Sequence, residues 1–225
     1  MRRPMVDYRR FRLSRLNTPE FSHLKLLVTW PIYLMLYILT ENLIPAEKCT
    51  PVHIFLDDWI PFCEWFVIPY VFWYGLILFS SWYFLLHDVD SFRRLQIYLF
   101  VTQILAMAIY ILFPSRQDLR PEVFSRDNAF TRIIGFIYRI DTNTGVCPSL
   151  HVAYSLGILS AWLRRRTTPL WGRVFVVLAA VLICLSTMFI KQHSAADFFA
   201  ALPVCLVAEV ISYCRVKKYP HPAPT

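Results

Sequence analysis

Long apolar runs are the feature of this 225-residue chain that most limits how it can fold. Five runs approach or exceed the roughly 20 apolar residues that carry a helix across a bilayer. Hydrophobic residues make up 57% of the chain and charged residues only 17%, against about 45–50% and about 25% in an average soluble domain. The sequence therefore predicts an all-α, polytopic membrane protein. Its spans are expected at 24–40, 59–86, 95–113, 174–190 and 195–213.

A sixth span is predicted over 150–163, a run that is shorter and more polar than the others. It contains Ser155 and Ser160, and it reaches the length of a span when 146–149 are included. Six transmembrane helices in one bundle are thus expected. A basic N-terminal arm (1–23) precedes this membrane domain (24–215), and a short tail (216–225) follows it. The first run is not expected to be a secretory signal, because the arm is long and no small-residue cleavage site follows.

Lys and Arg are distributed unevenly around the predicted spans. Sixteen of the 23 basic residues lie in 1–25, 87–94, 164–173 and 215–225. Because basic loops stay on the cytoplasmic side of a membrane, both termini are expected in the cytoplasm, with the protein integral to a plasma or inner membrane. Topology then accounts for the net charge of +8, and nucleic acid is not expected as a partner.

The predicted extracytoplasmic loops depart from this pattern. The first loop (41–58) is acidic, but the second (114–147) contains five arginines, among them Arg116 and Arg120, and Lys191 lies beside the fifth span. Topology does not require basic residues on this side, so they need another reason. Binding of an anion is the obvious one.

Ionisable and polar residues collect at three positions on the same predicted side. Arg116 and Arg120 follow the third span, Ser149 and His151 open the fourth, and the third position lies at the start of the sixth span. That position contains Lys191, His193 and Asp197. Such residues at membrane depth are costly and usually functional. We therefore expect the three positions to meet in one site.

His193 and Asp197 are four residues apart, which places both on one face of a helix. The carboxylate can then hold the Nδ1–H of the imidazole and leave Nε2 as an oriented nucleophile or base. Each feature also has a simpler structural explanation. The His–Asp pair can be a structural hydrogen bond, and Ser149 can be a helix N-cap. His151 can be a hydrogen-bonded interface histidine, and Arg120 can pair with a carboxylate of its own loop.

Together these residue types point to phosphoryl transfer. A histidine backed by an aspartate can attack phosphorus, a second histidine can protonate the leaving oxygen, and fixed cations can bind the remaining oxygens. The roles expected are nucleophile for His193, orientation of His193 for Asp197 and general acid and base for His151. Phosphate binding is expected of Arg116, Arg120, Ser149 and Lys191.

The same residues resemble the motifs of the type 2 phosphatidic acid phosphatases, a family related to vanadium haloperoxidases. Its second motif, Pro-Ser-Gly-His, is similar to Pro148-Ser149-Leu150-His151, and its third resembles Ser186 followed by His193-x-x-x-Asp197. Its first motif, a basic residue and then Arg-Pro, resembles Arg116 followed by Arg120-Pro121. The likeness covers roughly 95–215. The order of the motifs and their six-span placement also match the family. Phosphoryl transfer is expected to pass through a phosphohistidine, and no metal or cofactor is expected.

Two positions depart from the family pattern. Leu150 stands where the second motif has Gly, and Thr187 stands where the third has Arg, so Lys191 would supply that charge. These departures look more like the branch that includes inositol phosphorylceramide synthases. They leave open whether the phosphoryl acceptor is water or the hydroxyl of another lipid.

The expected function is that of a hydrolase: a membrane lipid phosphatase that cleaves a phosphate monoester or diphosphate on a headgroup at the extracytoplasmic face. The alternative is a lipid phosphotransferase, and a non-catalytic lipid-phosphate-binding protein is a further one. Two other classes also stay open, a metalloenzyme using His151, His193 and Asp197 and a transporter with an anion path. The lipid itself is not specified. A disulfide among Cys49, Cys63 and Cys147 is also left open.

Overall fold

The computed structural model describes residues 5–215, so the predicted tail at 216–225 lies outside the described residues. Helices dominate the fold, and the predicted all-α class is confirmed. The long helices are α1 (Thr29–Leu43), α3 (Val67–His87), α4 (Val89–Leu112), α6 (Leu150–Arg164), α7 (Leu170–Phe189) and α8 (Ala195–Arg215). Shorter helices lie in the connections, namely α2 (Phe55–Trp59) and α5 (Ala129–Ile140).

The remaining elements are short. The 3-10 helices are η1 (Tyr8–Arg10), η2 (Leu13–Arg15), η3 (Ser22–Val28), η4 (Ala46–Lys48) and η5 (Glu64–Phe66). Two-residue strands, β1 (Thr50–Pro51) and β2 (Ser115–Arg116), pair in parallel. This pairing joins the connection after α1 to the connection after α4.

Five segments within residues 5–215 are helical, long and apolar enough to cross a membrane. They are Ser22–Thr40, Glu64–His87, Val89–Leu112, Leu170–Phe189 and Ala195–Cys214. They match the five longer predicted spans and fit an integral membrane protein. The predicted sixth span corresponds to α6, whose 15 residues rise about 22 Å, less than the roughly 30 Å of a hydrocarbon core. The count of six therefore does not follow from helix length.

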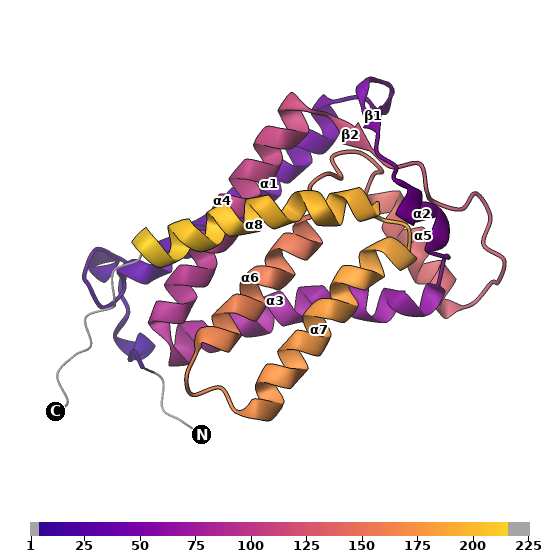
Figure 1. Ribbon diagram of the computed structural model, residues 1–225. Coiled ribbons are helices and arrows are strands. Elements are labelled where there is room, and N and C mark those ends of the chain that lie inside the picture. Colours follow the sequence, from indigo (N-terminus) through magenta and orange to yellow (C-terminus); the bar gives the residue numbers. More distant parts are fainter. Residues whose placement is uncertain (1–4, 216–225) are drawn as a thin grey trace.

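Helix α6 lies at the centre of the bundle, between α3, α4, α7 and α8 (Figure 1). Its side chains at Val152, Ala153, Ile158 and Ala161 are buried. At Gly157 the ring of Tyr98 on α4 packs so closely that an added methyl group would overlap it. Small residues let helices approach closely within a membrane. Gly157 lets α6 approach α4 in this way.

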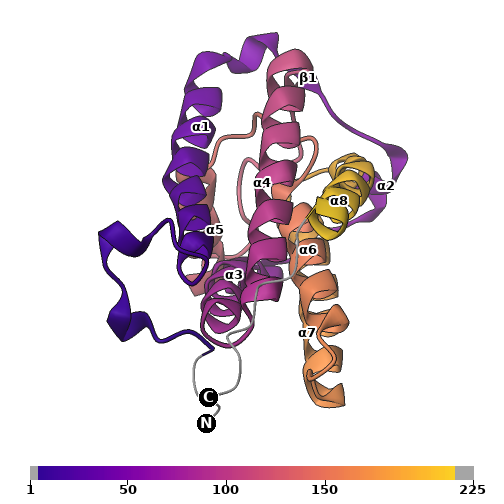
Figure 2. The same cartoon turned by 90° about the vertical axis from the view of Figure 1, so that its left-hand side faces the viewer.

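Helix α4 is flanked by α1 on one side and α8 on the other (Figure 2). The indole Nε1–H of Trp30 donates to the side-chain oxygen of Gln96 at 2.8 Å, which ties α1 to α4. The N-terminal arm packs where α3 joins α4, because Val6 and Phe21 form a buried cluster with Val89. This junction is one end of the bundle.

At the opposite end lie α2, α5 and the β1–β2 pair, beside the first residues of α3, α6 and α8 (Figure 1). We call it the α2/α5 end. The backbone N–H of Thr50 donates to Pro114 at 2.9 Å, and that of Val52 donates to Arg116 at 2.7 Å. The connections that the sequence places on one side of the membrane therefore meet at one end of the structure.

Candidate functional site

The turn between α7 and α8 presents His193 at the α2/α5 end. The backbone N–H groups of Gln192 and His193 both donate to the carbonyl of Thr187, at 2.9 and 3.0 Å. Lys191 has a φ of 56°, a left-handed conformation that is uncommon outside glycine. Its backbone N–H donates to the carbonyl of Met188 at 3.1 Å. The chain thus reverses sharply after Phe189 and starts α8 at Ala195.

His193 and Asp197 form the pair that their spacing predicts. The Nδ1 atom of His193 lies 3.1 Å from a carboxylate oxygen of Asp197, and Asp197 is fully buried. The same oxygen accepts the backbone N–H of Ser194 at 3.0 Å. A carboxylate at Nδ1 favours the tautomer with its proton there. Nε2 is then the nitrogen available for chemistry.

Ser149 connects the start of α6 to the start of α8. Its side chain caps α6 by accepting the backbone N–H of Val152 at 3.5 Å. Its backbone N–H donates to the carbonyl of Asp197 at 3.1 Å. Ser149 is fully buried and is therefore a helix cap, in line with the simpler explanation of this residue. The two helices that carry the histidines are fixed to one another here.

His151 lies beside His193, with a distance of 5.8 Å between ring centroids. The rings of Tyr70 and Trp73, both on α3, pack against it at 4.4 and 4.1 Å. His151 is only 8% exposed, and its Nε2 atom has no hydrogen-bond partner among the described residues. A buried polar atom of this kind usually has a partner, so a bound molecule would satisfy it.

Both histidines line a cavity of about 460 Å³. Residues of α1, α3, α4 and α6 form most of its wall, and aromatic rings predominate. Leu34 of α1 and Tyr74 and Leu78 of α3 line the cavity and are more than half exposed, as is Ile140 at the end of α5. The cavity therefore opens sideways between α1 and α3, where lipid would surround the bundle.

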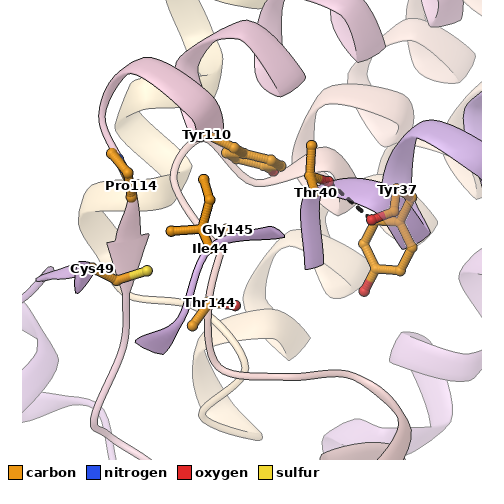
Figure 3. Close-up of a pocket in the computed structure, with 8 residues that line it drawn as sticks. All are labelled: Tyr37, Thr40, Ile44, Cys49, Tyr110, Pro114, Thr144 and Gly145. Atoms are coloured by element: carbon orange, nitrogen blue, oxygen red, sulfur yellow. Dashed lines mark hydrogen bonds between the residues drawn. The ribbon is translucent and has the colours of Figure 1, made fainter. Parts of the chain in front are cut away.

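A smaller pocket adjoins this cavity at the α2/α5 end (Figure 3). Tyr37, Tyr110, Thr144 and Gly145 line both spaces. Gly145 has a φ of 59° and lies against the ring of Tyr110. Thr144 and Gly145 therefore form part of the wall of both the cavity and the smaller pocket.

The three cations predicted to bind phosphate lie around the cavity, but none of them lines it. Arg116 donates to the carbonyl of Ala46 at 3.2 Å and lies 3.2 Å from the carboxylate of Asp118. Arg120 donates to carbonyl oxygens at 2.7–3.2 Å and stacks on the ring of Tyr138. In this structure both arginines hold backbone in place, and their phosphate-binding role stays a prediction.

Lys191 also points away from the cavity. Its ammonium donates to the carbonyls of Asp57 and Ile60, at 3.1 and 2.5 Å. Burial lowers the pKa of Lys191, and the nearby charges of Asp57 and Asp58 partly offset this. Lys191 therefore ties the α7–α8 turn to α2, and its proposed contact with phosphate is likewise untested.

Four residues near the histidines were not singled out from the sequence: Asp57, Tyr70, Trp73 and Asp141. Asp57 belongs to a loop whose acidity fitted the predicted topology. Tyr70 and Trp73 belong to an aromatic span of the kind that faces lipid. Asp141 follows α5 in a polar loop. No local spacing marks any of them, because each reaches the site through tertiary packing.

Comparisons of the chain with protein-family models, with curated proteins and with solved structures find no match. Within residues 5–215, no three His, Cys, Asp or Glu side chains are grouped as a metal ion would need. The alternative of a metal held by His151, His193 and Asp197 therefore gains no support from the geometry. The six cysteines are all free thiols in the structure, including the three considered for a disulfide.

Proposed function

We propose that this chain is an integral membrane phosphatase that hydrolyses a phosphate monoester or diphosphate on a lipid headgroup through a phosphohistidine. The observation that carries the proposal is the paired imidazoles. His193, held by Asp197, faces His151 across 5.8 Å at the end of a membrane-embedded cavity. A phosphoryl group of a lipid is a ligand that both rings could contact at once.

The two histidines would divide the chemistry between attack and proton transfer. Nε2 of His193 attacks phosphorus as the bond to the leaving oxygen breaks. His151, which takes up a proton when the phosphate binds beside it, gives that oxygen its proton. In the second half-reaction, water gives a proton to His151 and attacks phosphorus, which breaks the P–N bond and releases phosphate. Asp197 stabilises the charge that forms on the His193 ring in the first step.

The start of α6 supports anion binding next to these rings. The N-terminus of a helix presents unpaired N–H groups and a positive dipole end, which together favour a phosphate. We propose that the first residues of α6, Leu150 and His151, contribute these N–H groups, because both residues line the cavity. Ser149 would add its hydroxyl, since its own N–H is bonded to the carbonyl of Asp197. Three cations outside the cavity wall would add positive potential, namely Arg116, Arg120 and Lys191. Alternatively, their side chains would rotate inward and bind the phosphate directly.

The proposed topology has six spans, with α6 as the short one. A helix enclosed by α3, α4, α7 and α8 touches little lipid, so it need not match the full thickness of the bilayer. The distribution of Lys and Arg then assigns the arm end to the cytoplasm. The α2/α5 end, with the histidines, would face the extracytoplasmic side. Substrate would enter sideways from the bilayer between α1 and α3, keeping its hydrocarbon chains near Leu34 and Leu78.

Transfer of a phospho-headgroup to the hydroxyl of a second lipid is the other candidate, and the apolar walls of the cavity favour it. Apart from the histidines and a few polar groups, the cavity is lined by rings and aliphatic side chains. Such a wall suits a second lipid better than water. The acceptor would use the same step, giving its hydroxyl proton to His151.

A direct test offers the purified protein in detergent a panel of lipid monophosphates and diphosphates, with vanadate as inhibitor. Free phosphate and newly formed phospholipid are assayed side by side. We expect turnover that is lost in His193→Ala and His151→Ala, while His53→Ala retains it, because His53 bonds the exposed Asp58 away from the cavity. Absence of turnover with every lipid in the panel would favour a non-catalytic binding protein instead.

A further inference from the structure

Asp141 is the one carboxylate among the described residues that line the large cavity. One of its oxygens accepts the hydroxyl of Tyr37 at 2.6 Å. The other accepts the side-chain amide of Gln192 at 2.7 Å and the hydroxyl of Tyr70 at 3.4 Å. All of these donors are neutral. Among the described side chains, no ion pair reaches the carboxylate of Asp141; the guanidinium of Arg120 instead donates to the backbone carbonyl of Asp141, at 2.9 Å. A carboxylate whose oxygens have only neutral donors, in a largely aromatic cavity, would gain from a cation that a ligand supplies.

The rest of the cavity wall also favours a cation. The faces of tyrosine and tryptophan rings carry negative potential and attract ammonium groups. No Lys or Arg lines the cavity in the part of the chain that the structure describes. The rings that line it, together with Tyr37, are Trp30, Tyr33, Trp73, Tyr74, Tyr110 and Tyr154.

Asp141 lies close to the two histidines. Gln192, which bonds its carboxylate, directly precedes His193. Tyr70, whose hydroxyl bonds the same carboxylate, stacks its ring on His151 at 4.4 Å. A ligand with phosphate at the histidines would therefore place any group a few atoms away beside Asp141.

We propose that the lipid headgroup bound here carries an ammonium group a few bonds from its phosphate, so that the ammonium sits on Asp141 among the aromatic rings. This inference rests on the proposed function, because it takes the phosphate to lie at His151 and His193. Two sources share this chemistry, namely the phosphate of a long-chain amino alcohol and a phospholipid whose polar head is an amino alcohol. Either one brings a positive charge that balances Asp141.

Binding of simple amphiphiles tests the ammonium site without any need for turnover. The probes are dodecyltrimethylammonium and a neutral dodecyl ether, and quenching of Trp30 and Trp73 fluorescence in purified protein reports their binding. We expect wild type to bind the ammonium probe about tenfold more tightly, because the aromatic rings and Asp141 attract a cation. Asp141→Asn should remove that preference. Asp118→Asn, half exposed and outside the cavity, should keep it.

Equal binding of the two probes to wild type would overturn the proposal, and this comparison holds even if Asp141→Asn does not fold. An unchanged preference in a folded Asp141→Asn protein would overturn it as well. The melting temperature of each variant shows whether it is folded.

Measurements of turnover then show which of the two amine-bearing lipids is the substrate. They also distinguish failure of the ammonium site from failure of the proposed phosphatase function. Phosphate release is compared for a long-chain amino alcohol phosphate and its amine-free analogue, and headgroup transfer is measured with an amino-alcohol phospholipid. Equal His193-dependent turnover of amine-bearing and amine-free lipids would contradict the ammonium site and leave the proposed function standing. Selective ammonium binding without turnover of any lipid would contradict the phosphatase and the transferase, and would leave the ammonium site standing.

Discussion

The carboxylate of Asp57 on α2 accepts the hydroxyl of Ser194 at 2.6 Å and the backbone N–H of Ala195 at 2.7 Å. Asp57 is buried, and it thereby holds the residues that immediately follow His193. Lys191 completes the connection by donating to the carbonyls of Asp57 and Ile60. The connection after α1 is therefore part of the frame that fixes the orientation of His193.

Asp57→Asn should lower turnover and stability together. An amide can replace only one of the two acceptor oxygens, and hydrogen bonds to charged groups contribute about 1.5–3 kcal/mol. We expect kcat to fall at least about tenfold with little change in KM, because the substrate would still bind while His193 loses its position. Steady-state kinetics in detergent measures this. The matched control is Asp58→Asn, since Asp58 is exposed and bonds His53; a loss of equal size in that variant would argue against the role of Asp57.

Asp197→Asn should slow the chemical step while leaving the fold intact. The amide oxygen can still accept the N–H of Ser194, but it carries no charge to stabilise the His193 ring after attack. By analogy with other carboxylate–histidine pairs, turnover is expected to fall by a factor on the order of 10²–10⁴. Rapid-quench measurement of the first half-reaction checks this prediction. Wild-type rates in this variant would mean that the pair is only a structural hydrogen bond.

Gly157→Ala should destabilise the bundle, whereas Gly75→Ala should not. A methyl group at Gly157 overlaps the buried ring of Tyr98, while one at Gly75 has no heavy atom within 4 Å. Overpacking costs about 1–3 kcal/mol, which lowers the melting temperature by about 2–4 °C for each kcal/mol in a chain of this size. Thermal unfolding in the same detergent compares the two variants. Equal melting temperatures would show that α4 and α6 are not packed as closely as described.

The thiol of Cys147 should react slowly with alkylating reagents at neutral pH. Burial, together with the charge of Asp197, raises its pKa to about 12, from about 8.5 in an ordinary cysteine. The thiolate is the reactive form, so a raised pKa leaves less of it at any pH below 12. The alkylation rate at Cys147 should therefore keep rising through pH 10. Mass spectrometry of the labelled peptide follows this, with the exposed Cys214 as comparator, and a plateau near pH 9 would contradict it.

Much of the bundle could be predicted because apolar runs locate helices directly. The last span was expected at 195–213, and Ala195–Cys214 is found. The observed starts of the spans differ from the predicted ones where a turn or a helix cap, rather than hydropathy, sets the start of the helix. The second span starts at Glu64 rather than at 59, since α2 ends at Trp59 and the chain turns before η5. The third starts at Val89 because Asp88 caps it, accepting the N–H of Ser91 at 3.0 Å.

The site could be predicted only where residues lie on the spans themselves. His151 lies in the first turn of α6 and His193 lies just before the start of α8, at the same end of the bundle. The order of the spans along the chain already predicts that these two helix starts lie on one side. The orientation of the side chains of Arg116, Arg120 and Lys191 could not be predicted, because these side chains donate to backbone carbonyls in distant parts of the chain. Asp57 and Asp141 reach the site in the same way, through tertiary contacts that hydrophobic periodicity does not encode.

The most direct test of the account is to locate the covalent intermediate. The purified protein is mixed with a labelled lipid phosphate that it turns over, quenched in alkali to preserve phosphohistidine, digested and analysed by mass spectrometry. The account predicts a label on His193 that is stable in alkali and labile in acid, and that is absent from His193→Ala. A His193→Ala protein with more than about 10% of wild-type turnover, or a label on any other residue, would contradict it.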